Sequence, residues 1–327
     1  MDTSFFALAE QIYKVNKPLF DDLRRERNKH FLLLCLASLL MTPALMSFIY
    51  SNLQQHITVP SVTILALPCF LLCTVCMYPG FNNAYRAIAK KPFLSGLAGH
   101  LGLTFSPGGV LRLGDLYDHN LLPPYSTREV EEGFKGRING FDVEFQDFTV
   151  STVARLGRFD YRSLFNGQPF YGIAMRVHLN RTFHHHTVLM PSFMANGTMN
   201  RYLNQKFSSF ENINIVFKKI HQHYSIVSGN QIEARVIFDP AMIERVITLG
   251  ERLGAYWLAI SFMDREMVII AGQARNFFEI GSLLHMPSVL TIEKALNEID
   301  LFKSVIEILE LNPHTGPGTA LLQKQFE

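Results

Sequence analysis

A histidine triplet is the most conspicuous candidate for chemistry in this sequence. His184–His186 falls in a stretch whose composition predicts a β-strand. Alternate side chains of a strand face the same way, so His184 and His186 share one face and are the candidate metal ligands, with His178 one strand-length away. No carboxylate or cysteine lies close by in the sequence. We therefore interpret the triplet as polar strand residues and predict no metal ion and no cofactor.

Two other patterns resemble functional motifs but lack residues that those motifs require. His221 and His223 repeat the two-residue spacing, again without a third ligand nearby. Ser106–Val110 is rich in glycine but lacks the Lys-Ser/Thr of a phosphate-binding loop, so we interpret it as a linker. Serine, histidine and aspartate are all present, yet no nucleophile-elbow pattern marks any of them. The sequence thus predicts no catalytic residue.

Pairs of charged residues fit an exposed sheet better than an acid–base site. Glu131-Glu132 and the alternating Asp142 and Glu144 are the candidate paired acids, and we assign them to an exposed β-face. Glu233 and Arg235 are two residues apart, so on a strand they would face one side and form an ion pair.

The element that positions everything else is a pair of apolar runs. Phe31–Tyr50 and Val59–Tyr78 each contain twenty residues and no Asp, Glu, Lys or Arg. At about 1.5 Å per residue a helix of that length crosses the roughly 30 Å hydrocarbon core of a bilayer. The alternatives are two buried helices of a soluble protein and a cleaved signal peptide. The signal peptide fits less well, because about thirty residues with several acids precede the first run and a second run follows it.

Flanking charge predicts the orientation of these spans. Cations stand on both outer flanks and are missing from the short connection between the runs, which places both termini in the cytoplasm. The residues predicted at the membrane surface are Arg24, Arg25, Arg27 and Lys29 before the first run, and Arg86, Lys90 and Lys91 after the second.

The charge and cysteine distributions agree with a cytoplasmic C-terminal part. Residues 1–91 hold nine Lys/Arg and five Asp/Glu, so most of the positive charge lies beside the membrane and the remainder is close to neutral. A near-neutral domain argues against a nucleic-acid partner. All four cysteines lie in the apolar runs, at positions 35, 69, 73 and 76, so the large domain has no disulfide scaffold. The Cys73-x-x-Cys76 pair is best explained as small residues of a membrane helix.

The predicted architecture is α+β: an N-terminal transmembrane helical hairpin, then a cytoplasmic domain with an antiparallel sheet and flanking helices. Pro18 is expected to kink or break the N-terminal helix, and Pro79-Gly80 the helix after the second run. The predicted boundaries are 1–30 for an amphipathic helix, 31–78 for the hairpin, 79–105 for a juxtamembrane helix and linker, 106–312 for the cytoplasmic domain (possibly divided near 195–210), and 313–327 for a flexible tail.

Turn signals predict the individual strands and helices. Asn139-Gly140 is the strongest hairpin signal, between Phe134–Ile138 and Phe141–Phe145. Asp239-Pro240 is a strong helix start for Ala241–Leu253. The further expectations are a hairpin of Tyr161–Phe165 with Pro169–Leu179, a strand at Thr182–Met190, a short helix at Met199–Phe207, strand candidates within Phe217–Val227, a hairpin of Trp257–Phe262 with Met267–Ala271, and a helix over Leu290–Leu311.

A resemblance to a family covers most of the chain, from about residue 10. The stretch Tyr224–Val246, the segments Ala259–Phe262 and Met267–Ala271, and Phe277-Phe-Glu resemble an uncharacterised family of bacterial two-span membrane proteins, described only as a domain of unknown function and sometimes labelled galanin-like. The resemblance implies the architecture above and a bacterial inner membrane. It implies no activity and no functional residues.

These observations favour a membrane-anchored cytoplasmic interaction or assembly protein without enzymatic activity. Its expected partners are the lipid bilayer and either another protein or its own copies. One alternative is a subunit of an oligomeric pore or transport complex, which the lack of intramembrane charge weakens. A second alternative is a membrane-tethered hydrolase with an unrecognised site.

Overall fold

The computed structural model divides the chain into two compact units, which are described separately. The helical unit comprises residues 1–97 and 279–296, and the sheet unit comprises residues 98–278 and 297–327. The structure describes residues 3–53, 59–112, 114, 116, 119, 121, 125–152, 170–191, 210–213, 224–273 and 277–311. The predicted strand 161–165, the predicted helix 199–207, His221, His223 and the predicted tail 313–327 lie outside these residues.

The helical unit begins with two helices in place of the single amphipathic helix predicted within residues 1–30. Helix α1 covers Thr3–Val15 and α2 covers Lys17–Leu53. The division falls at Asn16, close to Pro18, as the proline predicted. Proline is tolerated in a first helical turn because the N–H it lacks would have no partner there. Helix α2 then continues through the first apolar run.

Helices α2 and α3 run antiparallel, as two ring contacts between the first half of α2 and the second half of α3 show. Helix α3 covers Val59–His100, and its Phe93 ring lies 6.2 Å from Phe20 of α2 while Tyr85 lies 6.2 Å from His30. Of the kink or break predicted at Pro79-Gly80, the break is excluded, since α3 continues through both residues. One helix of the described part, Lys17–Ser51, is long and apolar enough to cross a membrane, judged by length and composition alone.

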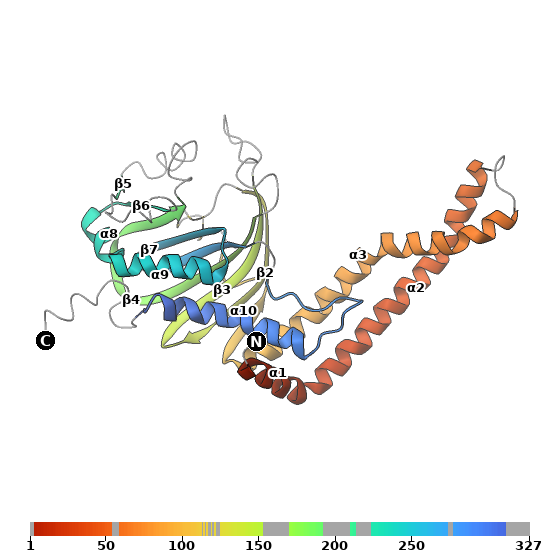
Figure 1. Ribbon diagram of the computed structural model, residues 1–327, viewed down its shortest axis with the longest axis horizontal. Coiled ribbons are helices and arrows are strands. Elements are labelled where there is room, and N and C mark those ends of the chain that lie inside the picture. The colour runs from red at the N-terminus through yellow and green to blue at the C-terminus, as the bar shows by residue number, and fades with distance from the viewer. Residues whose placement is uncertain are drawn as a thin grey trace. The chain divides into compact units, whose positions relative to one another are not determined.

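The sheet unit confirms the predicted antiparallel sheet with flanking helices (Figure 1). Among the described residues the sheet has seven strands, in the order β1-β2-β3-β4-β6-β5, and β7 pairs with β4. The strands are β1 (Leu103–Pro107), β2 (Tyr125–Ile138), β3 (Phe141–Thr152), β4 (Phe170–Pro191), β5 (Glu211–Asn212), β6 (Tyr224–Ser228) and β7 (Trp257–Gln273). Strand β1 corrects the linker interpretation of Ser106–Val110, because Ser106 and Pro107 pair with β2.

The hairpin predicted at Asn139-Gly140 is confirmed. Strand β2 ends at Ile138 and β3 begins at Phe141, and both turn residues have positive φ, 50° and 87°. Asparagine and glycine adopt that conformation at little cost, and it matches the twist of the paired strands.

Strands β4 and β7 are each longer than predicted. Thr182–Met190 continues the strand that begins at Phe170, and the hairpin predicted over residues 263–266 is one uninterrupted strand. Pairing is irregular both at the hairpin predicted over 263–266 and at the gap predicted between Leu179 and Thr182. From the pair His178↔Glu266 to the pair Thr187↔Phe262, β4 advances nine residues and β7 only four, so the extra residues form bulges. A bulge interrupts regular pairing without reversing the chain, so the strand continues where a turn was predicted.

One face of the sheet, here the helix face, is covered by helices of the sheet unit (Figure 1). Helix α9 (Pro240–Leu253) has the predicted start, since Asp239 Oδ1 accepts a hydrogen bond from Met242 N, and Gly254 ends it at φ 60°. Helix α8 (Gln231–Ile237) precedes it and corrects the strand geometry assumed for Glu233 and Arg235. In α10 (Val289–Ile308), Phe302 stacks on Phe145 of β3 with ring centroids 4.2 Å apart.

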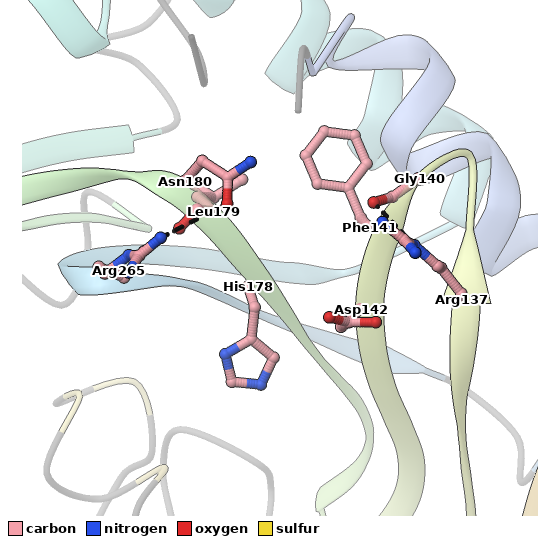
Figure 2. Close-up of a pocket in the computed structure, with 8 residues that line it drawn as sticks. All are labelled: Arg137, Gly140, Phe141, Asp142, His178, Leu179, Asn180 and Arg265. Carbon is pink, nitrogen blue, oxygen red and sulfur yellow. Dashed lines mark hydrogen bonds between the residues drawn. The ribbon is translucent and has the colours of Figure 1, made fainter. Parts of the chain in front are cut away.

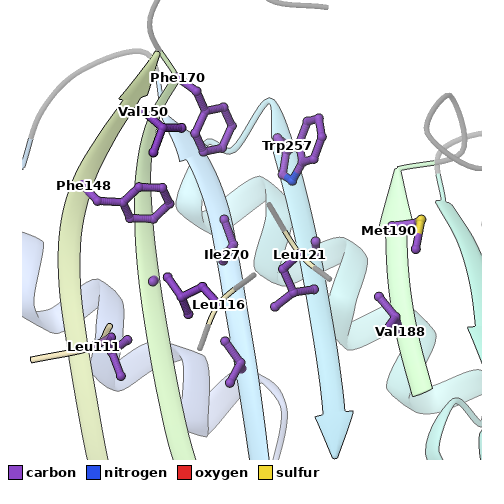
Figure 3. Close-up of a cluster of buried hydrophobic side chains, with 13 residues drawn as sticks. Leu111, Leu116, Leu121, Phe148, Val150, Phe170, Val188, Met190, Trp257 and Ile270 are labelled. Carbon is purple, nitrogen blue, oxygen red and sulfur yellow. The ribbon is translucent and has the colours of Figure 1, made fainter. Parts of the chain in front are cut away.

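The opposite face, here the groove face, is apolar at one end (Figure 3). Phe148 of β3, Phe170 of β4 and Trp257 of β7 are fully buried there, below leucines of the segment that follows β1. Gly172 and Gly272 pair directly beneath these rings, where a Cβ atom would lie 2.6–2.8 Å from the aromatic side chains or Trp257 Cβ. The other end of this face carries charged side chains and forms the candidate site.

Candidate functional site

Two cross-strand rows of charged side chains form the polar end of the groove face. The first joins Lys135 of β2, Glu144 of β3 and Arg176 of β4, which are successive register partners. The second begins with Arg137 and Asp142, also register partners, and continues with His178, which is paired with Glu266. Strand alternation puts both rows on one face because all these positions are two residues apart along each strand.

Arg176 is held between two carboxylates. Its Nε donates to Glu144 Oε2 at 2.8 Å, its Nη2 contacts the same oxygen, and its Nη1 lies 3.7 Å from Glu266 Oε2. All three side chains are less than one-third exposed, so solvent screens these interactions less than it would on an open surface. The charge of Arg176 is thus compensated by carboxylates of the protein itself.

A chain of polar contacts leads from Glu266 into the interior of the sheet unit. His178 Nδ1 lies 3.5 Å from Glu266 Oε1, and His119 Nε2 lies 3.6 Å from Glu266 Oε2. His119 Nδ1 is 3.0 Å from Ser261 Oγ, which is 2.8 Å from His186 Nε2. A hydroxyl has one hydrogen, so Ser261 donates to one imidazole and accepts from the other. The contacts therefore couple the protonation of the two rings.

Ser261, His119 and Glu266 follow one another in the order of a serine hydrolase triad. The exposure of these groups is unlike that of a working nucleophile, because Ser261 is fully buried and His119 is 3% exposed. The Ser261 hydroxyl is also shared with His186, and a nucleophile must reach a substrate carbonyl. The arrangement is best described as a buried polar link between β4, β7 and the segment containing His119.

Two adjoining cavities open beside the charged rows. The larger, of about 390 Å³, lies where β3 and β4 separate, and Figure 2 shows His178 and Asp142 facing the space between these strands. The second, of about 360 Å³, lies over the first charged row. The residues lining both are Arg137, Asp142 and His178; Gly140, Phe141, Leu179, Asn180 and Arg265 complete the larger cavity, and Thr104, Lys135, Gly136, Val143 and Glu144 the smaller.

The histidines predicted as candidate metal ligands have separate environments. His184 is exposed, and its backbone N–H donates to Glu233 Oε1 at 3.1 Å. His185 N–H donates to the other oxygen of the same carboxylate at 2.9 Å. His186 instead contacts Ser261. In the part of the chain that the structure describes, no group of three His, Cys, Asp or Glu residues is arranged to hold a metal ion.

The residues predicted at the membrane surface lie on the helical unit, most of them with local partners. Arg25 pairs with Asp22 at 3.4 Å, Lys29 with Glu26 at 3.6 Å, and Arg86 with Glu279. Arg27 Nη2 donates to Asn28 Oδ1 at 2.9 Å, Arg24 Nε donates to Met286 Sδ at 3.4 Å, Lys90 is half-buried, and Lys91 is exposed.

Sequence reasoning placed Asp142 and Glu144 on one face but missed their partners. Alternation along β4 would have put Arg176 and His178 together, and the hairpin register would have added Lys135 and Arg137. His119 had no such signal, because it lies between β1 and β2 in the sequence and reaches Ser261 only in the folded chain.

Comparison with known proteins gives a family of unknown function for part of the chain. The family model described as "Protein of unknown function (DUF3137)" matches residues 168–311. The match includes β4, β7 and therefore Arg176, His178, Ser261 and Glu266, while the β2–β3 hairpin precedes it. A search of curated proteins finds no match.

One solved structure is similar over much of the chain. It is the crystal structure of the mycobacterial trehalose monomycolate transport factor A, TtfA, at 10% sequence identity and a TM-score of 0.34. The similarity covers 65% of this chain and 92% of that one.

Proposed function

We propose that this protein is anchored in a bacterial inner membrane by two helices and acts there as a non-enzymatic interaction or assembly protein. The observation that carries the anchor is the exposure of apolar side chains. On α2, Leu40 is 78% and Phe48 67% exposed; on α3, Leu67 is 66% and Val75 68% exposed. A large apolar side chain gains about 1.5–3 kcal/mol when it leaves water, so a surface of this kind favours lipid.

Both apolar runs take part in the proposed anchor. Nine large apolar side chains of the first run and four of the described part of the second are exposed. Few positions of the runs are buried, among them Leu34, Ser38 and Cys69. A soluble core helix would show the reverse, with most of its apolar surface covered.

The proposed orientation follows from the cations beside the runs. Arg24, Arg25, Arg27 and Lys29 precede the first, and Arg86, Lys90 and Lys91 follow the second, so both flanks remain on the cytoplasmic side. The sheet unit then works at the inner face of the membrane. Its partner is another protein or a second copy of the chain.

Purification in a mild detergent with a measured mass tests the interaction. We expect either a mass that is a multiple of 37.3 kDa after subtraction of the detergent, or a defined second protein at constant ratio. A monomer without any co-purifying protein contradicts the proposal. Repeating the measurement at high salt separates a specific complex from one held only by exposed charges.

A hydrolase is the second candidate, favoured by the contact order Ser261–His119–Glu266. A fluorophosphonate probe, which modifies activated serines, distinguishes the two. Burial of Ser261 predicts no labelling of the full chain. Labelling that disappears in Ser261→Ala but persists in Ser225→Ala would overturn the non-enzymatic proposal.

A further inference from the structure

The larger cavity lies at a fork in the sheet. Pairing between β3 and β4 ends at Val143↔Val177, beyond which β3 turns back through the hairpin and β4 continues to its bulge. The cavity of about 390 Å³ lies at this separation and adjoins the second cavity of about 360 Å³. Each is in the size range of small-molecule sites, roughly 300–1,000 Å³. Polar and charged side chains make up most of the lining, so a hydrophilic ligand fits it.

In the part of the chain that the structure describes, three cations around the cavities have no ion pair. Within the described residues, Lys135, Arg137 and Arg265 have no carboxylate within 4.0 Å, in contrast to Arg176, whose charge is satisfied by Glu144 and Glu266. Like charges gathered on one concave surface repel one another and raise the local positive potential. An anion in the cavity would relieve this repulsion.

Hydrogen bonds to the protein position both guanidinium groups. Arg137 Nε donates to Gly140 O at 3.2 Å, on one side of the cavity (Figure 2). On the other side, Arg265 Nε donates to Leu179 O and Nη2 to Asn180 Oδ1, both at 3.4 Å. A guanidinium has five N–H donors, so each arginine retains donors for a ligand. These contacts reduce the side-chain entropy lost on binding.

The charge of the unpaired groups selects the class of ligand. Opposite the three cations stands one carboxylate without an ion pair in the described part of the chain, that of Asp142. With Arg176, Glu144 and Glu266 included, four cations and three carboxylates leave a net charge of +1. A phosphate monoester carries about −1.5 to −2 at neutral pH and has three strong acceptor oxygens, which arginine recognises in a bidentate manner. We infer that the larger cavity, where β3 and β4 separate, binds a phosphate monoester group, carried either by a soluble metabolite or by a lipid headgroup.

Calorimetric titration of the full-length protein in a neutral detergent tests this inference, with glycerol 3-phosphate and inorganic phosphate as soluble probes. We expect saturable binding that weakens as salt is raised. Arg137→Gln and Arg265→Gln should each weaken it by about tenfold or more, the size expected for one charge-assisted hydrogen bond. Arg235→Gln is the matched control, because Arg235 is exposed on α8 and lines neither cavity.

Asp142→Asn gives a test of opposite sign. Removing the one unpaired carboxylate should tighten binding several-fold, about threefold to tenfold, because the ligand no longer meets a like charge. A loss of folding cannot produce tighter binding, so this variant separates recognition from damage to the sheet.

Vesicles distinguish the two sources of the phosphate group. In neutral phosphatidylcholine vesicles containing the full chain, phosphatidic acid should compete with glycerol 3-phosphate if the natural ligand is a headgroup. Binding of the soluble probe without competition supports a metabolite, and Arg137-dependent binding to phosphatidic acid alone supports a lipid. The inference is overturned if neither probe binds at millimolar concentration, or if Arg137→Gln and Arg265→Gln bind as well as Arg235→Gln. The detergent titrations require no membrane anchoring, so their outcomes are independent of the proposed function. Only the comparison of phosphate sources in vesicles depends on it.

Discussion

The two units of this protein treat apolar side chains in opposite ways. In the described part of the sheet unit only Ile232 and Tyr256 are large apolar residues with an exposed surface, whereas α2 alone exposes nine in its apolar run. Composition separates them in part, because the runs Phe31–Tyr50 and Val59–Tyr78 contain no Asp, Glu, Lys or Arg. The rest of the difference lies in what each element can pack against: the sheet buries its apolar side chains under helices and under the leucines that follow β1, and α2 leaves most of its apolar run uncovered by protein.

The largest effect should come from the core of the sheet unit. Phe145 is fully buried and stacks on Phe134 and Phe302. Phe145→Ala should lower the free energy of unfolding by about 3–5 kcal/mol, because the cavity it leaves is enclosed by aromatic rings. Chemical denaturation followed by the fluorescence of Trp257 measures this. Ile232→Ala, at an exposed site, is the control, and a similar loss in both variants would refute the contrast between core and surface.

Introducing arginine at an equally exposed apolar position in each unit tests the difference between the units. Leu40 on α2 and Ile232 on α8 have the same exposed fraction, 78%. Leu40→Arg should disfavour membrane insertion by about 2.5–3.5 kcal/mol, the cost of arginine at the centre of a span. Ile232→Arg faces water and should change stability by less than about 0.5 kcal/mol. Flotation on a density gradient reports insertion, and equal flotation of the two variants would contradict a lipid-facing α2.

The buried polar link should have an intermediate effect. Ser261→Ala removes the hydroxyl between His119 and His186 and so breaks two hydrogen bonds at a fully buried position, at a cost of about 1–3 kcal/mol in unfolding free energy. Ser225→Ala on β6 is the control, because Ser225 is half-buried and its side chain makes no hydrogen bond within the described residues. Equal stability of the two variants would show that losing the Ser261 hydrogen bonds costs no stability, and would contradict a stabilising role for the link.

The smallest effect is expected at the start of α9, which the sequence predicted. Asp239→Ala removes the acceptor for Met242 N and should reduce stability by about 1 kcal/mol. Asp239→Asn retains an acceptor and should restore most of the loss. Thermal denaturation of the three proteins checks this order, and an alanine variant as stable as the asparagine variant would argue against the cap.

Local signals predicted what depends on a few adjacent residues. Asn139-Gly140 specified its hairpin and Asp239-Pro240 its helix, because turn and cap geometry is set within four residues. The failures required long-range information. The charged residues 264–266 fit a turn or a bulge equally well, and only pairing with β4 decides between them. Ser261 and His119 are 142 residues apart, so no spacing in the sequence could predict their contact.

The central claim is that two spans hold the sheet unit at the inner face of a membrane, and cysteine accessibility tests it most directly. All four native cysteines lie in the apolar runs, so replacing them with alanine gives a background for single probes. Gln55→Cys reports on the connection between the runs, and Ile232→Cys on the sheet unit. In intact spheroplasts, a membrane-impermeant maleimide should label position 55 and should reach position 232 only after lysis. Labelling of position 232 in intact spheroplasts, or protection of position 55, would contradict the account.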